Sequence, residues 1–326
     1  MKSKILEILR NKDTYVSGQE LSERFGVSRT AVWKAIHQLE EEGYRIEAVP
    51  RKGYHMVETP DVVCKEEILS LLETKWAGRN LVYLETVDST NDLAKKLADQ
   101  GAPEGTLVVA DEQTGGKGRR GRAWCTPKGS AIAMTIVLRP DIRPELASMV
   151  TLVMGLSVAK AIGSLYPVSV GIKWPNDVVV NGKKICGILT EMSAEMTGIH
   201  YLVIGTGINT NVEEFPEEIQ SVATSLIKEL GEKVNRAELI AACLKYFEEY
   251  YEKYIAAGNL APLKEDYEAL LLNRNNKVRV LEPSHEYTGL SLGINEDGEL
   301  LVEKEDGTVT AVYAGEVSVR GVYGYV

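Results

Sequence analysis

Cysteine and histidine are scarce in this 326-residue chain, which contains four of each. The cysteines, Cys64, Cys125, Cys186 and Cys243, lie far apart and form no Cys-x-x-Cys pair. This distribution argues against both a zinc cage and a disulfide framework. We therefore expect reduced, mostly buried thiols.

Long apolar runs are also missing. The longest nearly apolar stretch, Thr151 to Tyr166, is interrupted by Lys160 and is too short to span a bilayer. Residues 1–7 lack the apolar core of a signal peptide. A hydrophobic fraction of 44% and a charged fraction of 26% are ordinary for a globular protein. We expect a cytoplasmic protein of two or three domains that does not associate with membranes.

Several common catalytic motifs are absent as well. The chain has no Gly-x-x-x-x-Gly-Lys-Ser/Thr phosphate loop, no Gly-x-Gly-x-x-Gly opening a Rossmann unit, no Gly-x-Ser-x-Gly elbow and no His-Glu-x-x-His. These absences exclude the ordinary nucleotide, hydrolase and metalloprotease sites.

Negative charge dominates, but unevenly. The net charge is −10, whereas residues 1–60 alone carry a net charge of +1. An acidic body is a poor polyanion binder, so any contact with nucleic acid should be confined to the N-terminal part.

The first sixty residues predict three helices. An apolar helical face at Ile5–Leu9 precedes a capping box formed by Ser17 and Glu20. A second helix begins there and ends at Gly26, and Ser28 caps a third helix. A helix, a glycine-containing turn and a second helix make a helix-turn-helix.

A hairpin over residues 45–56 follows the third helix and completes a winged helix-turn-helix. A solvated charged face, with Trp33 in the core, is the alternative interpretation of that helix. We favour DNA binding, with base contacts from the third helix and phosphate contacts from the hairpin tip. The predicted DNA-binding residues are Ser28, Arg29, Thr30, Trp33, Lys34, His37, Arg51 and Lys52.

After a linker over residues 58–64, strands and helices alternate, which is typical of a mixed α/β domain. The expected strands are residues 81–85, 106–110, 131–138, 172–180, 183–191 and 201–209, with a hairpin at Asn181-Gly182, and a buried helix is expected over 146–165. From residue 236 to 267 the periodicity is helical. Short strands at 277–281, 300–303 and 309–313 then predict a small β-barrel.

Residues 113–122 interleave four glycines with four cations, and Trp124 follows. Glycine exposes main-chain N–H groups to a ligand, and arginine grips phosphate or carboxylate oxygens with paired hydrogen bonds. A solvated basic turn is the alternative. The density of glycines favours an anion-binding loop.

Several motifs together resemble those of biotin protein ligases. They are Gly116–Arg122 with Trp124, Lys173–Asp177, Lys184 with Gly187, Gly205–Asn209, and the closing segment Gly315–Gly321. With the winged helix in front and the small barrel behind, the whole chain resembles the bifunctional biotin ligases that also repress the biotin operon. The family's loop usually reads Gly-Arg-Gly-Arg-Arg-Gly-Arg, so Lys117 departs from it; the lysine keeps the charge and loses the guanidinium fork, and a main-chain role survives there.

The resemblance implies a reaction in two steps. The carboxylate of biotin attacks the α-phosphate of ATP, with Mg²⁺ bridging ATP oxygens, and biotinyl-5′-AMP and pyrophosphate form. A lysine ε-amine on a biotin carboxyl carrier protein, such as the acetyl-CoA carboxylase subunit, then displaces AMP. Because two anions must meet, cations and aligned amides are the main requirement.

The resemblance also implies the site residues. The catalytic residues are Lys184, Arg119, Arg122 and Asp177. The biotin-binding residues are Ser89, Thr90, Asn91, Gln113, Lys117, Gly118, Arg119 and Lys184. The nucleotide-binding residues are Arg120, Arg122, Asn176, Asn209 and Arg320, and no side chain is assigned as a metal ligand. Helix capping by residues 89–91, a turn role for Asp177 and a structural role for Arg320 remain alternatives.

We therefore predict an α+β protein of three domains. Residues 1–60 form a winged helix-turn-helix, 65–272 a ligase domain with a mixed sheet of the biotin/lipoate ligase, class II synthetase-like type, and 273–326 an SH3-like barrel. The expected partners are the carrier domain, operator DNA of biotin genes, and a second copy of the chain that pairs through a sheet edge when biotinyl-5′-AMP, the corepressor, binds. A metabolite-sensing DNA-binding protein without catalysis and a lipoate-type ligase are the alternatives.

Overall fold

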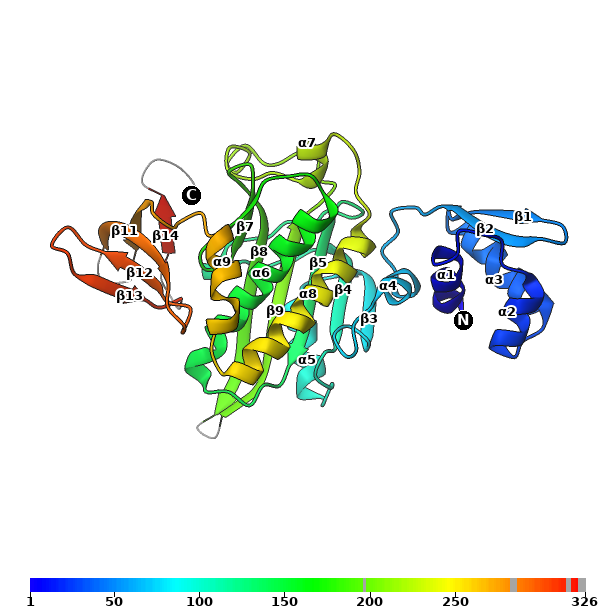
Figure 1. Cartoon of the computed structure of the whole chain (residues 1–326), viewed down its shortest axis with the longest axis horizontal. Coiled ribbons are helices and arrows are strands. Elements are labelled where there is room, and N and C mark those ends of the chain that lie inside the picture. Colours follow the sequence, from blue (N-terminus) through cyan, green and yellow to red (C-terminus); the bar gives the residue numbers. More distant parts are fainter. Residues whose placement is uncertain (196–197, 282–285, 315–317, 322–326) are drawn as a thin grey trace. The chain divides into compact units, whose positions relative to one another are not determined.

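The computed structural model describes residues 1–195, 198–281, 286–314 and 318–321. Its contacts divide the chain into two compact units (Figure 1). The first comprises Met1–Leu72 with Asn235–Ala241, and the second comprises Glu73–Val234 with Ala242–Val326. Residues 58–64, the predicted linker, therefore belong to the first unit.

Three amphipathic helices and a hairpin of the first unit share one apolar core. They are α1 (Lys2–Arg10), α2 (Gly18–Phe25), α3 (Arg29–Glu41), β1 (Arg45–Val49) and β2 (Gly53–Glu58). Leu21, Val32 and Leu39 are fully buried in the core. Gly26, between α2 and α3, has a φ of 62°, a left-handed conformation that glycine adopts readily. The predicted winged helix-turn-helix is confirmed.

The capping box predicted at the start of α2 is only half present. The Glu20 amide donates to Ser17 Oγ at 3.0 Å, as at a helix N-cap. The Glu20 carboxylate, however, pairs with Lys12. The predicted contact of the Glu20 carboxylate with the Ser17 amide is therefore wrong. A cation is a stronger partner for a carboxylate than a backbone amide is.

Helix α4 (Lys65–Leu71) is tied to the first unit by buried charge. Glu67 is fully buried and accepts hydrogen bonds from Arg10 at 2.6 Å and from the Tyr44 hydroxyl at 2.7 Å. An unpaired carboxylate would be costly there. Asp61 likewise accepts from the Arg236 guanidinium at 2.9 Å. These contacts fix the segment that follows the hairpin.

The second unit is built on a seven-stranded sheet of order β3-β4-β5-β9-β8-β7-β6. Its strands are β3 (Leu81–Val87), β4 (Leu107–Gln113), β5 (Ala131–Leu138), β6 (Val170–Lys173), β7 (Asp177–Val180), β8 (Lys183–Glu195) and β9 (Gly198–Asn209). Strands β3 and β4 are parallel, and the other neighbours are antiparallel. The predicted mixed sheet is confirmed.

Helices cover both faces of this sheet. Helix α5 (Thr90–Asp99) packs Ala94 against Val203 of β9 on one face. Because successive strand residues face opposite sides, Gly205 and Gly207 face α5 as well. Helix α6 (Ala147–Leu165), preceded by the short turn η2 (Pro144–Leu146), contacts β6, β7 and β8 on the other face. Figure 1 shows α6 and α8 (Arg236–Ala257) crossing in front of the strands.

Helix α6 lies in the core of the second unit. In the part of the chain that the structure describes, only Pro144–Leu165 is long and apolar enough to cross a membrane, and 78% of its most apolar window is buried inside the protein. Fully buried Val150, Val153 and Ile162 show that its apolar side chains contribute to the core.

The single strand predicted over residues 172–180 is wrong. The chain forms β6 and β7 instead, which face each other with Lys173 opposite Asp177. Pro175 lies between them, has no N–H to donate to a ladder and fixes its own φ, so a turn replaces the strand. This turn presents Asn176 and Asp177 together.

The continuous helix predicted over residues 236–267 is also wrong. Helix α8 ends at Ala257, and Gly258 follows with a φ of 71°, which a right-handed helix cannot include. A 3₁₀ turn, η3 (Ala261–Leu263), and helix α9 (Lys264–Leu270) complete the segment.

The C-terminal residues form a five-stranded antiparallel sheet of order β13-β12-β11-β10-β14. Its strands are β10 (Lys277–Leu281), β11 (Glu286–Ile294), β12 (Leu300–Glu303), β13 (Val309–Val312) and β14 (Ser318–Gly321). Strand β11 was not predicted, because its two glycines weaken the β pattern. Buried Trp174 joins this sheet to the central one, since its indole N–H donates to the Gly298 carbonyl at 2.9 Å.

Candidate active site

The glycine and arginine loop forms a compact hairpin at the end of β4. Lys117 pairs with Ala123 across it, and the Gly118 amide donates to the Arg122 carbonyl at 2.7 Å. The short turn η1 (Arg119–Gly121) makes the tip, where Arg120 has a φ of 58°. We call residues 116–124 the loop hairpin. Its cations are presented by ordered backbone, as an anion-binding loop requires.

Two cations of the predicted site meet the turn between β6 and β7. Lys184 Nζ lies 2.6 Å from Asp177 Oδ1, and Arg119 Nη1 lies 2.8 Å from Asn176 Oδ1. Burial lowers the pKa of the Arg119 guanidinium, and the charge of Asp177 opposes that shift. An arginine remains charged at neutral pH, so the site holds two positive groups.

A small cavity lies between the loop hairpin and the sheet, and we call it the cradle cavity. Gly187 and Gly207 are paired across β8 and β9 on its floor. A Cβ atom on Gly207 would lie 2.3 Å from Trp124 Nε1, so the indole lies directly on the bare backbone. The cavity volume is about 50 Å³, far below the 300 Å³ or more of usual ligand sites. Trp124 must therefore move for a ligand to enter.

Polar side chains surround one end of the cradle cavity. Gln113 Oε1 accepts hydrogen bonds from the Thr90 amide at 2.9 Å and the Thr90 hydroxyl at 3.0 Å. Thr135 donates to Asn91 Oδ1 at 2.7 Å. The Ser89 hydroxyl accepts a hydrogen bond from the Asp92 amide at 3.4 Å and caps α5. Ser89 thus has the capping role given above as its alternative interpretation. Fixed donors and acceptors of this kind suit a ligand that is itself polar.

Among the described residues, one buried polar group that borders the cradle cavity, Trp124 Nε1, has no hydrogen-bond partner. Burying such a group without a partner costs about 1–3 kcal/mol. A ligand with complementary groups would relieve that cost.

A larger cavity of about 710 Å³, the loop cavity, adjoins the cradle cavity beneath residues 212–223. Helix α7 (Leu226–Leu230) follows residues 212–223 in the chain. Asn209 lines this cavity, although its amide also donates to the Thr224 carbonyl at 3.1 Å. The space is large enough for a nucleotide-sized ligand.

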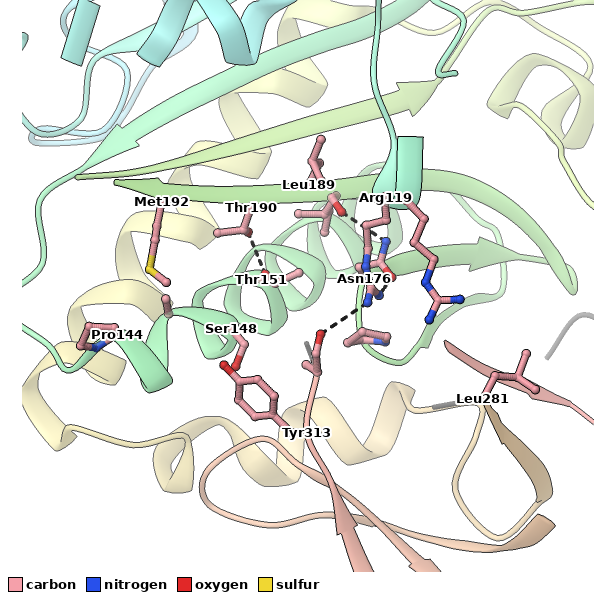
Figure 2. Close-up of a pocket in the computed structure, with 15 residues that line it drawn as sticks. Arg119, Pro144, Ser148, Thr151, Asn176, Leu189, Thr190, Met192, Leu281 and Tyr313 are labelled. Atoms are coloured by element: carbon pink, nitrogen blue, oxygen red, sulfur yellow. Dashed lines mark hydrogen bonds between the residues drawn. The ribbon is translucent and has the colours of Figure 1, made fainter. Parts of the chain in front are cut away.

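A third cavity of about 770 Å³, the sheet-edge cavity, lies on the α6 side of β8. Figure 2 shows Thr190 and Met192 of β8 on one side of it and Tyr313 of the C-terminal sheet on the other. The Tyr313 hydroxyl donates to the Glu145 carbonyl at 3.1 Å. Arg119 and Asn176 border all three cavities. One guanidinium thus lies where the three spaces meet.

The predicted ligand residues are largely brought together. Those around the cradle cavity are Ser89, Thr90, Asn91, Gln113, Lys117, Gly118, Arg119 and Lys184. Those around the loop cavity are Arg120, Arg122, Asn176, Asp177 and Asn209. Arg320 lies on β14 opposite Arg279, but its side chain and residues 315–317 fall outside what the structure describes.

The sequence did not predict Trp124, Thr135, Thr206 or Glu191 as parts of the site. Trp124 carried a signal, because a tryptophan directly follows the glycine-rich loop. The other three lie on strands, and only the strand register brings them to the cavity or to Asn91.

The predicted DNA-binding face of the first unit is open to solvent. Its members are all exposed: Ser28, Arg29, Thr30, Trp33, Lys34, His37, Arg51 and Lys52. Trp33 is 53% exposed and stacks on His37 with ring centroids 5.2 Å apart, so its alternative placement in the core is wrong. Arg51 occupies the hairpin tip with a φ of 69°.

Comparison with known proteins defines the family. The chain is 41% identical to the bifunctional ligase/repressor BirA of Bacillus spizizenii over 93% of each chain. The chain belongs to this family of bifunctional biotin ligases and repressors. It is also 31% identical to the Escherichia coli BirA, covering 97% of this chain and 96% of that one. The predicted family resemblance is confirmed.

Domain families and a solved structure agree with this assignment. Residues 83–209 match the biotin/lipoate A/B protein ligase family, 2–55 an HTH domain and 275–320 the biotin protein ligase C-terminal domain. A biotin protein ligase from Aquifex aeolicus in complex with biotin and ATP superposes with a TM-score of 0.67 at 34% identity, over 74% of this chain and 99% of that chain. The protein is thus a biotin protein ligase that carries a repressor's DNA-binding domain.

Proposed function

We propose that the protein converts biotin and ATP into biotinyl-5′-AMP and then transfers biotin to a carrier lysine. A carboxylate oxygen of biotin attacks the α-phosphorus and pyrophosphate leaves; a lysine amine then attacks the acyl carbon and AMP leaves. The observation that carries this proposal is the position of Arg119 and Lys184 between the cradle and loop cavities. Cations there neutralise both the carboxylate and the phosphate in the first step.

The cradle cavity is proposed to bind biotin. Ser89, Thr90 and Gln113 supply polar groups for the ureido ring, and Gly187 and Gly207 leave room for an apolar tail once Trp124 has moved. The amides of residues 117–119 are proposed to hold the carboxylate once the hydrogen bond from the Gly118 amide to the Arg122 carbonyl opens. Because unmatched polar groups would each cost about 1–3 kcal/mol, lipoate should be strongly disfavoured.

The loop cavity is proposed to bind the nucleotide, and the predicted residues for it are Arg120, Arg122, Asn176, Asn209 and Arg320. In the described residues, no group of three His, Cys, Asp or Glu side chains could hold a metal. Mg²⁺ in nucleotide reactions is held mainly by phosphates with one or two carboxylates, and Glu214 lines this cavity, whereas Asp177 is paired with Lys184. The cavity therefore fits Mg²⁺ that would be held chiefly by ATP and would neutralise phosphate charge.

The sheet-edge cavity is proposed to admit the acceptor lysine of the carrier domain. It opens on Arg119 and Asn176 and is bordered by Thr190, Met192 and Tyr313 (Figure 2). A lysine side chain entering here reaches the junction of the three cavities, where Asp177 can attract its ammonium. Acetyl-CoA carboxylase and other biotin carboxylases would supply the carrier.

The strand edge beside this cavity suits a second partner. Strand β7 pairs with β8 from Lys183 as far as Gly187. Among the residues that the structure describes, no strand pairs with residues 189–195 of β8 on that side. Such an edge pairs readily with another strand. We propose that the adenylate orders the loop hairpin and favours a homodimer through this edge, which presents two winged helices to operator DNA of biotin genes in the cytoplasm.

The proposed division of labour follows the predicted domains: residues 1–60 bind DNA, 65–272 catalyse, and 273–326 support the nucleotide side. One assay tests the enzymatic part. The full-length protein is incubated with Mg-ATP and biotin or lipoate, the adenylate is detected by mass, and a carrier domain is added. A biotinylated carrier lysine is expected, and lipoyl product or no product would overturn the proposal.

Analytical ultracentrifugation tests the dimer. We expect a larger mass in the presence of biotin and ATP, with tighter operator binding under the same conditions. Equal masses and equal operator affinities with and without ligand would rule out ligand-driven dimerisation.

A further inference from the structure

The Lys117 side chain, at the border of the cradle cavity, reaches helix α5. Its ammonium donates to Asp92 Oδ2 at 2.6 Å, and Lys95 Nζ lies 2.9 Å from the other oxygen of the same carboxylate. Asp92 belongs to the first turn of α5. One carboxylate thus joins a cation of the loop hairpin to a cation of the helix.

This contact continues to the floor of the cavity. Lys95 Nζ lies 2.8 Å from Glu191 Oε1 on β8, and Glu191 Oε2 accepts a hydrogen bond from Asn91 Nδ2 at 2.8 Å. The Asn91 side chain lies against Gly205, where a Cβ atom would be 2.1 Å from Asn91 Oδ1. A chain of alternating charges, formed by Lys117, Asp92, Lys95 and Glu191, therefore connects the loop hairpin with the Asn91 side chain.

The loop hairpin has contacts on two sides. On the β7 side, Arg119 donates to Asn176 at 2.8 Å and to the Ala314 carbonyl at 3.4 Å. On the α5 side, Lys117 meets Asp92. Because Arg119 is the cation proposed to turn to the substrate anions, the contact on the α5 side is the one that ligand binding leaves in place.

We infer that the ion pair of Lys117 and Asp92 is a latch that holds the loop hairpin closed over bound biotinyl-5′-AMP. Lys117 is then a positioning residue whose side chain acts on the hairpin and not on the substrate. The inference rests on the proposed function of the cradle cavity. It also accounts for a lysine at position 117, since one compact ammonium suffices for one carboxylate.

The pair is open to solvent, and its effect should be modest. The side chains of Lys117 and Asp92 are 55% and 33% exposed. Lys117 and Lys95 both hold the pKa of Asp92 below its usual value, with the Lys117 hydrogen bond the largest cause, so the carboxylate is charged at neutral pH. Loss of an exposed pair of this kind should speed ligand release by about two- to fivefold, and added salt should screen the pair.

The test measures the dissociation rate of biotinyl-5′-AMP from the full-length protein. We expect Lys117→Ala and Asp92→Asn each to release it about two to five times faster, and the double variant to release it no faster than either single variant. Lys117→Arg should keep the wild-type rate. Glu85→Gln is the matched control, because it removes the exposed pair of Glu85 and Lys128 at 3.5 Å, close to the same loop.

A second readout separates a latch from a general loss of structure. At about 1 M salt, where screening acts within about 3 Å, the wild type should release the adenylate as fast as Lys117→Ala, while their unfolding temperatures stay equal. Additive effects of the two substitutions, or a difference that persists at high salt, would overturn the latch. If the wild type neither forms nor binds biotinyl-5′-AMP, the proposed function itself fails. If the wild type binds biotinyl-5′-AMP and the variants release it at the same rate, only the latch fails.

Discussion

Lys184 Nζ lies 2.6 Å from Asp177 Oδ1, and both side chains are largely shielded from solvent. The carboxylate is therefore paired with the ammonium that we propose to be catalytic. We propose that the anions of biotin and ATP give Lys184 new partners, which leaves Asp177 to attract another cation, the acceptor lysine of the carrier.

This relationship predicts that Asp177→Asn separates the two steps. Formation of biotinyl-5′-AMP should remain within about tenfold of wild type, because both cations are kept. Transfer to the carrier should slow by about 10²-fold or more, as for loss of a group that assists proton transfer. Single-turnover measurements of each step decide it. Impaired adenylate formation with normal transfer would instead assign Asp177 to the nucleotide.

A methyl group on Gly207 should impair biotin binding. The Cβ of Gly207→Ala would lie 2.3 Å from Trp124 Nε1 and fill the cradle floor. Overpacking of this kind costs about 1–3 kcal/mol, so we expect the KM for biotin to rise about tenfold or more. Gly163→Ala in α6 is the control, since a Cβ there meets nothing within 4 Å. An unchanged KM for Gly207→Ala would show that biotin binds elsewhere.

The hairpin tip of the first unit should contribute phosphate contacts to DNA. Replacing Arg51 and Lys52 together by alanine should weaken binding to all sequences. It should also reduce the slope of log affinity against log salt by about 2, because each phosphate contact contributes about 0.9. Titrations of operator and unrelated duplexes over a range of salt measure this. A slope equal to that of wild type would remove the hairpin from the interface.

The cysteines should differ sharply in reactivity. Cys125 is exposed and lines the loop cavity, whereas Cys186 and Cys243 are buried, and burial raises the pKa of both buried thiols. Since only the thiolate reacts, iodoacetamide should modify Cys125 first and leave the two buried thiols intact. Biotin with ATP should protect Cys125. Mass spectrometry of peptides checks this, and early labelling of Cys186 would contradict the described core.

Local sequence patterns predicted much of the fold. The winged helix-turn-helix followed from Ser17, Gly26 and Ser28, whose roles as caps and turn depend on near neighbours in the chain. The position of the loop hairpin followed in the same way, because glycines and cations interleaved over ten residues act locally; its binding of an anion remains a prediction. Two predictions of long elements failed, at Pro175 and Gly258, where one residue interrupts a longer periodic pattern.

The interior of the site could not be predicted in this way. The pairing of Gly187 with Gly207 depends on the register of β8 and β9, and the position of Trp124 depends on that pairing. The contact between Lys117 and Asp92 joins residues 25 positions apart through the placement of α5 on the sheet. Long-range geometry of this kind is fixed by packing, which the sequence pattern does not display.

We propose that positive side chains, and no covalent enzyme group, join biotin to AMP. The most direct test is the single-turnover rate of biotinyl-5′-AMP formation from Mg-ATP and biotin in the double variant Arg119→Ala, Lys184→Ala. Since removing one charge-stabilising group typically costs about 10²–10³ in rate, we expect the double variant to lose at least about 10²-fold. Adenylate formation at the wild-type rate would show that these two cations do not catalyse the step.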